Sequence, residues 1–103
     1  MRTAKLEESV KEVAKIYFIA LRQLSVDRLS SGEQDIYSPF YKYYQDVEIA
    51  FSHLNKEQQR IITKEFFYDG YGNWWTSQYK PREFKKKKIG AMKFFLEVFY
   101  EIH

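Results

Sequence analysis

The chain has 103 residues, of which 45% are hydrophobic and none is cysteine, and its formal net charge is +3. This length and apolar content predict a single domain, residues 1–103, with its own core, and exclude a disordered chain. The lack of cysteine excludes disulfides and Cys-ligated zinc and fits a reducing cytoplasm. The longest apolar run near the N-terminus, residues 16–21, is too short for a signal-peptide core or a membrane span. We therefore expect a cytoplasmic protein that does not bind membranes.

Positive charge is concentrated in the C-terminal part of the chain. Residues 1–79 hold ten Lys or Arg and eleven Asp or Glu, whereas residues 80–93 hold seven and one, a net charge of +6. A local patch of this kind favours an anionic partner more strongly than the overall charge does. A solvated helix face is the other interpretation, and for a lone lysine run it has about even weight.

The first part of the chain predicts two helices. Apolar residues at spacings of three and four indicate a long amphipathic helix over residues 4–29. It can cover the following helices, which we favour, or pair with a second copy in a homodimer. A polar segment at residues 30–35 predicts a loop. Ser38 and Pro39 then suit the N-cap and the first position of a tyrosine-rich helix over residues 39–53.

Two further helices are predicted before the basic region. Asn55 and Gln58 have the spacing of a capping box at the start of a helix over residues 56–68. Residues 68–73 contain two glycines and an aspartate, which predicts a turn. A short helix over residues 74–79 follows. We expect one of its two tryptophans to anchor in the core and the other to lie at its edge.

The last predicted helix begins at Pro81 and continues to about Ile102. At about 100° per residue, one of its faces is apolar and should pack inward, while its first three turns present a basic ridge. Lys88 lies near the apolar stripe, and we expect its ammonium group to extend outward along its own methylenes. The predicted apolar face consists of Phe84, Ala91, Phe95, Val98, Phe99 and Ile102, with Met92 at its border.

Several segments share their spacing with a known family: Leu54–Ile62, Trp74-Trp75, Tyr79, Phe84–Lys86 and Ala91–Phe95. They resemble the C-terminal promoter-reading domain of bacterial sigma-70 type factors (region 4), and more closely the small sigma-like helix-turn-helix proteins of mollicutes and some phages. The resemblance covers roughly the stretch from 40 to 100. It implies an all-α, five-helix domain.

The resemblance implies that residues 39–103 form the sigma-like part, with a helix-turn-helix at residues 74–95. It also implies that the protein acts in transcription, alongside RNA polymerase, and that its last helix reads DNA. The N-terminal turns of such a helix lie nearest the base edges, which places Arg82, Lys85 and Lys86 at the major groove. Arg82 is the expected reader of guanine, and the remaining lysines contact phosphates. The predicted DNA-binding residues are Lys80, Arg82, Lys85, Lys86, Lys87 and Lys93.

Two other functions stay open. A helical adaptor could bind protein alone, for example RNA polymerase, through the first helix or the tyrosine-rich second one. A purely structural domain with a solvated basic helix is the third possibility. His53 and His103 do not have metal-ligand spacing, and we find no catalytic constellation. We therefore predict no enzymatic activity, no metal and no cofactor.

Overall fold

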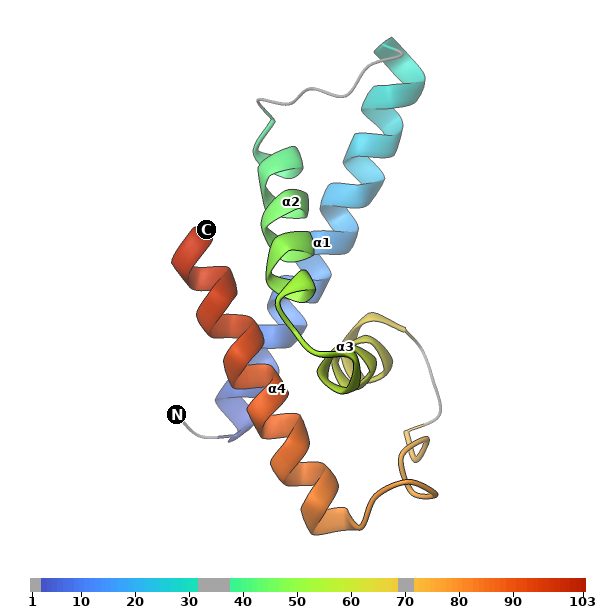
Figure 1. Ribbon diagram of the computed structural model, residues 1–103. Coiled ribbons are helices and arrows are strands. Elements are labelled where there is room, and N and C mark those ends of the chain that lie inside the picture. Colours follow the sequence, from blue (N-terminus) through green and yellow to red (C-terminus); the bar gives the residue numbers. More distant parts are fainter. Residues whose placement is uncertain (1–2, 32–37, 69–71) are drawn as a thin grey trace.

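The computed structural model describes residues 3–31, 38–68 and 72–103, and within these ranges every regular element is helical. The all-α class predicted from the sequence is thus confirmed. None of the helices in the described ranges combines the length and apolar character needed to cross a membrane. The elements are α1 (Thr3–Ser31), α2 (Pro39–Ser52), α3 (Lys56–Ile62), the π-helix η1 (Thr63–Phe67) and α4 (Pro81–Ile102) (Figure 1).

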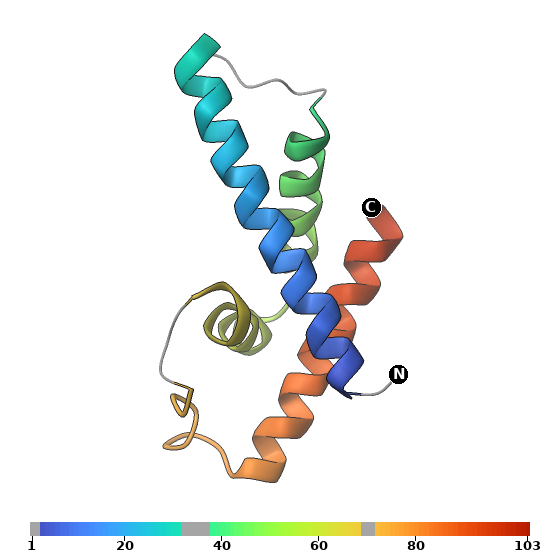
Figure 2. The ribbon, with the colours of Figure 1, turned by 180° about the vertical axis from the view of Figure 1, so that it is seen from behind.

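The long helix α1 packs against α2, η1 and α4. Figure 2 shows it lying alongside α2 and crossing α4, while its last turns extend beyond the start of α2. The first turns of α4 form the opposite end of the molecule, next to residues 72–80 (Figure 1). Every α-helix contributes buried side chains to one core, which includes Leu6, Val10, Val13, Val47, Ala50, Ile61, Ile62, Met92, Phe95 and Phe99.

The helix starts follow the capping signals in the sequence. The Ser38 hydroxyl accepts a hydrogen bond from the Phe40 amide at 3.2 Å, with Pro39 as the first helical residue. At α3, the Gln58 amide donates to Asn55 Oδ1 at 2.8 Å and the Asn55 amide donates to Gln58 Oε1 at 3.0 Å. Both predicted caps are confirmed, and each satisfies amides that a helix start leaves without intrahelical partners.

The buried face of α4 differs slightly from the prediction. Leu96, which was not predicted, is only 4% exposed, whereas Ile102 is 37% exposed and Val98 is half-buried. Leu96 lies one helical turn after the fully buried Met92, so the face is rotated toward Met92 rather than toward Val98. The neighbouring helices decide which residues of α4 are buried. The spacing of apolar residues within α4 does not reveal where those helices lie.

The predicted helix over residues 74–79 is wrong. Residues 72–78 form successive turns, in which the Thr76 amide donates to the Asn73 carbonyl at 3.1 Å and the Gln78 amide to the Trp75 carbonyl at 2.9 Å. Six residues are too few to offset the cost of helix nucleation without strong packing. The structure therefore has four α-helices in its described ranges rather than five, and α4 does not follow a tight turn from another helix.

The predicted helix over residues 56–68 is present but changes its hydrogen-bond pattern. After Ile62 it continues as the π-helix η1, in which the Tyr68 amide donates to the Thr63 carbonyl, five residues earlier, at 2.9 Å. Such segments are rare and occur frequently at functional sites. Residues 32–37 and 69–71, which cover most of one predicted loop and part of a predicted turn, lie outside the described residues.

Candidate nucleic-acid interface

An aromatic cluster fixes the start of α4. Phe84, in its first turn, is 4% exposed. Its ring stacks on Trp75 with centroids 4.5 Å apart, meets Trp74 edge-on at 5.6 Å and lies 5.7 Å from Tyr79. Both tryptophans are half-buried against Phe84, so the expected division into one core and one edge tryptophan is wrong. Because Phe84 is held on several sides, the first turn of α4, which carries the neighbouring cations, is held in place against residues 74–79.

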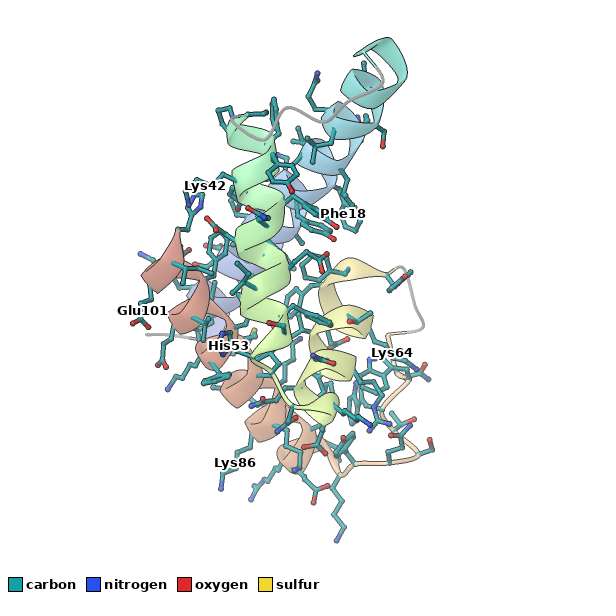
Figure 3. The ribbon with its side chains drawn as sticks, turned by 45° about the horizontal axis from the view of Figure 1, so that its top comes forward. Phe18, Lys42, His53, Lys64, Lys86 and Glu101 are labelled. Carbon is teal, nitrogen blue, oxygen red and sulfur yellow. The ribbon has the colours of Figure 1, made fainter. Side chains whose placement is uncertain are left out.

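All six predicted DNA-binding residues are exposed. On a helical projection Arg82, Lys86 and Lys93 share the side opposite the buried face, with Lys85 and Lys87 on its two flanks. Figure 3 shows Lys86 pointing away from the rest of the molecule. Among the described residues, no carboxylate lies within ion-pair distance of Lys80, Arg82, Lys85, Lys86 or Lys93. These five residues are called the basic face below.

Lys87 differs from the basic face because it has an acidic partner. Its Nζ lies 3.1 Å from Glu57 Oε1 on α3, and the other Glu57 oxygen accepts a hydrogen bond from the Tyr79 hydroxyl at 2.8 Å. Arg60 Nη2 donates to the same hydroxyl at 3.2 Å. The hydrogen bonds from Tyr79 and Lys87 stabilise the carboxylate and lower the pKa of Glu57. This network links α3 to the start of α4 across the surface.

Lys88 has a structural position, and the expectation that its ammonium extends to solvent is wrong. Its Nζ lies 2.9 Å from Glu7 Oε1 on α1 and 3.0 Å from Glu65 Oε1 on η1, with 20% of the side chain exposed. Burial alone lowers the pKa of Lys88, but the two carboxylates outweigh it and hold that pKa above its usual value. Lys88 therefore connects three elements and adds no free charge to the basic face.

Two cations of the preceding segment lie near the same end of the fold. Arg60 reaches Tyr79, as described above, and Lys64 Nζ lies 5.0 Å from the centre of the Trp74 ring. The Trp74 ring nitrogen donates to Glu65 Oε2 at 3.3 Å. From the sequence, Arg60 and Lys64 are expected to be ordinary solvent-exposed residues, and both are exposed in the structure. Their aromatic partners lie 10 to 19 positions away along the chain, so no local pattern signals these contacts.

The basic face consists of exposed cationic side chains, which attract anions. Within residues 3–31, 38–68 and 72–103, no group of three or more His, Asp or Glu residues is placed to hold a metal ion. Comparisons with protein-family models, with curated proteins and with solved structures gave no match.

Proposed function

We propose that this protein binds DNA through the basic face of α4 and acts in transcription in the manner of a sigma-like protein. One observation carries the proposal. Five exposed cations without carboxylate partners among the described residues lie between Lys80, the N-cap of α4, and Lys93, near the middle of that helix, whose opposite side is packed in the core. Duplex DNA carries about one negative charge per 1.7 Å of its axis, which suits a rigid row of cations.

The roles within the basic face follow from position along α4. Arg82 lies in the first turn and is free of ion pairs with the described carboxylates, so we assign it to a guanine edge, with Lys85 and Lys86 at the same groove. Lys80 and Lys93 would contact phosphates and position the helix. Lys87 would join them only after separating from Glu57.

A helix-turn-helix of the ordinary kind needs a first helix that supports the reading helix. Since residues 72–78 form turns, that supporting role would fall to α3, which packs beside α4, and to η1, whose Glu65 and Phe67 contact Lys88 and Phe95 of α4. Arg60 and Lys64 would then approach the DNA backbone from the same end. The role in transcription and an association with RNA polymerase are the parts of the proposal that come from the sigma resemblance alone.

The test is fluorescence anisotropy with labelled AT-rich and random duplexes across a salt series. The unmutated protein should bind at low salt, and its affinity should fall steeply between about 50 mM and 200 mM salt. The variant Arg82→Ala/Lys85→Ala/Lys86→Ala should bind far more weakly and lose its preference among duplex sequences, because these residues are assigned to the groove. The variant Lys80→Ala/Lys93→Ala should instead reduce the slope of log affinity against log salt by about 2, one for each lost phosphate contact.

The matched control is Lys5→Ala/Lys11→Ala/Lys15→Ala, which removes the same charge from exposed positions on α1. It should keep most of the affinity and most of the salt slope. Equal losses in the two triple variants would mean that only overall charge matters, and absence of binding by the unmutated protein at low salt would exclude DNA as the ligand.

The second candidate is a helical adaptor that binds protein. It is supported by three exposed apolar side chains of α1, Phe18, Ile19 and Val26, which are 42%, 41% and 50% exposed. The same surface would serve a homodimer. An apolar interface of this kind should change little with added salt, in contrast to DNA binding. Sedimentation equilibrium of the unmutated protein and of Ile19→Ser/Val26→Ser separates a dimer from a monomer.

A further inference from the structure

A pocket of about 420 Å³ lies between α1, α2 and η1, on a different part of the molecule from the basic face. Its volume is within the range of small-molecule sites, about 300–1,000 Å³. Phe18 projects from α1 toward this region beside α2 (Figure 3). The π-helix contributes Thr63 and Phe67 to its wall. A rare helix type thus lines part of this pocket.

Aromatic rings from four segments line this pocket. They are Tyr17 and Phe18 of α1, Phe51 of α2, Phe67 of η1 and Tyr68, which follows η1. Three of them support one another: Tyr17 meets Phe67 edge-on at 5.5 Å and Phe18 at 5.7 Å. Such rings attract apolar groups, and their negative faces also attract cations. These rings therefore favour an apolar or cationic ligand over an anion.

The wall also contains one carboxylate, that of Glu48 on α2. Its Oε1 accepts a short hydrogen bond from the Tyr17 hydroxyl. Within the described ranges no Lys, Arg or His forms an ion pair with Glu48, and no basic residue lines the pocket. Burial and the hydrogen bond to Glu48 raise the pKa of Tyr17, so its hydroxyl stays protonated and acts as the donor to the carboxylate.

We propose that this pocket binds a small apolar molecule that carries one ammonium group. The ammonium group would pair with Glu48 at the edge of the pocket, and the apolar body would lie among the rings of Tyr17, Phe18 and Phe67. A carboxylate without a basic partner beside several aromatic rings is the combination that recognises organic cations. The site is independent of the basic face and of the proposed binding of DNA.

The test uses three probes of nearly equal shape: 4-phenylbutylammonium, 4-phenylbutanol and 4-phenylbutanoate. Each is titrated into the full chain at neutral pH, and binding is followed by the amide NMR signals of Thr63 and Phe67 in η1. The ammonium compound should bind most tightly, the alcohol more weakly and the carboxylate below detection. Glu48→Gln should weaken the ammonium compound by about two- to fivefold, as expected for a solvent-exposed ion pair, and leave the alcohol unchanged.

Two further variants distinguish charge from shape. Glu97→Gln removes the same charge from an exposed position on α4 and should leave all three titrations unchanged. Phe18→Ala should weaken the ammonium compound and the alcohol together, because both lose contact with the ring. The proposal is wrong if the carboxylate probe shifts the η1 signals as strongly as the ammonium probe, if Glu48→Gln leaves ammonium binding unchanged, or if no probe shifts those signals.

Discussion

The rings of Trp75 and Phe84 stack with their centroids 4.5 Å apart and their planes 4° from parallel. Trp75 belongs to a segment of turns and Phe84 to the first turns of α4, so this contact attaches an irregular segment to the start of the helix that carries the basic face. Anchoring at this point would favour the proposed binding of DNA, since a cation contributes most when its position is fixed before the ligand arrives.

Replacing Phe84 by Ala should lower the free energy of unfolding by about 3 kcal/mol, because it removes a buried ring and leaves a cavity among three aromatic neighbours. Urea unfolding followed by circular dichroism measures this loss. Phe94→Ala on the same helix is the control, since Phe94 is 38% exposed, and it should cost about 1 kcal/mol or less. Similar losses for the two variants would contradict the described packing of α4.

Replacing Glu57 by Gln should increase DNA affinity if the proposed function is right. The change removes the carboxylate that holds Lys87 and frees one more cation for phosphate. We expect a gain of about two- to fivefold at low salt, since exposed ion pairs contribute about 1 kcal/mol or less. Glu97→Gln on α4 matches the change in net charge. An equal gain in that variant would show that overall charge, and not the release of Lys87, is responsible.

Replacing Lys88 by Met should destabilise the fold without weakening DNA binding. The change leaves the Glu7 and Glu65 carboxylates without their cation in a half-buried position, which we expect to cost about 1–3 kcal/mol. Lys85→Met, which lacks an ion-pair partner among the described residues, should change the free energy of unfolding by about 0.5 kcal/mol or less. DNA affinity should show the reverse order, with the loss in Lys85→Met and not in Lys88→Met.

Asp46 should make the fold sensitive to acid. Burial favours the protonated carboxyl, but hydrogen bonds from Lys42 Nζ at 2.6 Å and with His103 Nδ1 at 2.9 Å outweigh it and lower the pKa of Asp46. A pKa that is lower in the folded state contributes stability above the unfolded value, about 3.9, and this contribution is lost as pH falls through the folded pKa. Asp46→Asn should therefore lose less stability than the unmutated protein between about pH 5 and pH 2, measured by urea unfolding. An unchanged pH profile in that variant would show that other carboxylates set the acid sensitivity.

The helices could be predicted where their signals are local. The caps at Ser38 and Asn55 and the proline at the start of α4 each depend on residues within one turn, and all three are present in the structure. The prediction of a helix over residues 74–79 failed because its tryptophans pack against Phe84 in a non-helical conformation. A helical tendency this short is easily outweighed by tertiary contacts.

The exposure of the cations could be predicted, but their pairing could not. The helical period placed Arg82 and Lys86 opposite the buried face, because the side of a helix on which a residue lies depends on that helix alone. Lys87 pairs with Glu57, 30 positions away in the sequence, and Lys88 pairs with Glu7 and Glu65, which lie 81 and 23 positions away. Only the three-dimensional packing of α1 and α3 against α4 brings these charges together.

The π-helix η1 affects how the fold should respond when a residue is deleted from the chain, as distinct from when one is substituted. A turn closed by a hydrogen bond five residues back contains one residue more than an α-helical turn, as between Thr63 and Tyr68. Deleting a single residue from η1 would bring Tyr68 to four residues after Thr63, so the same amide and carbonyl would close an ordinary α-helical turn. The extra residue is therefore taken up within η1, and Tyr68 would keep its position relative to α3. One deletion in η1 should thus be tolerated better than one deletion in α3, which would rotate the helix on its two sides by about 100° relative to each other.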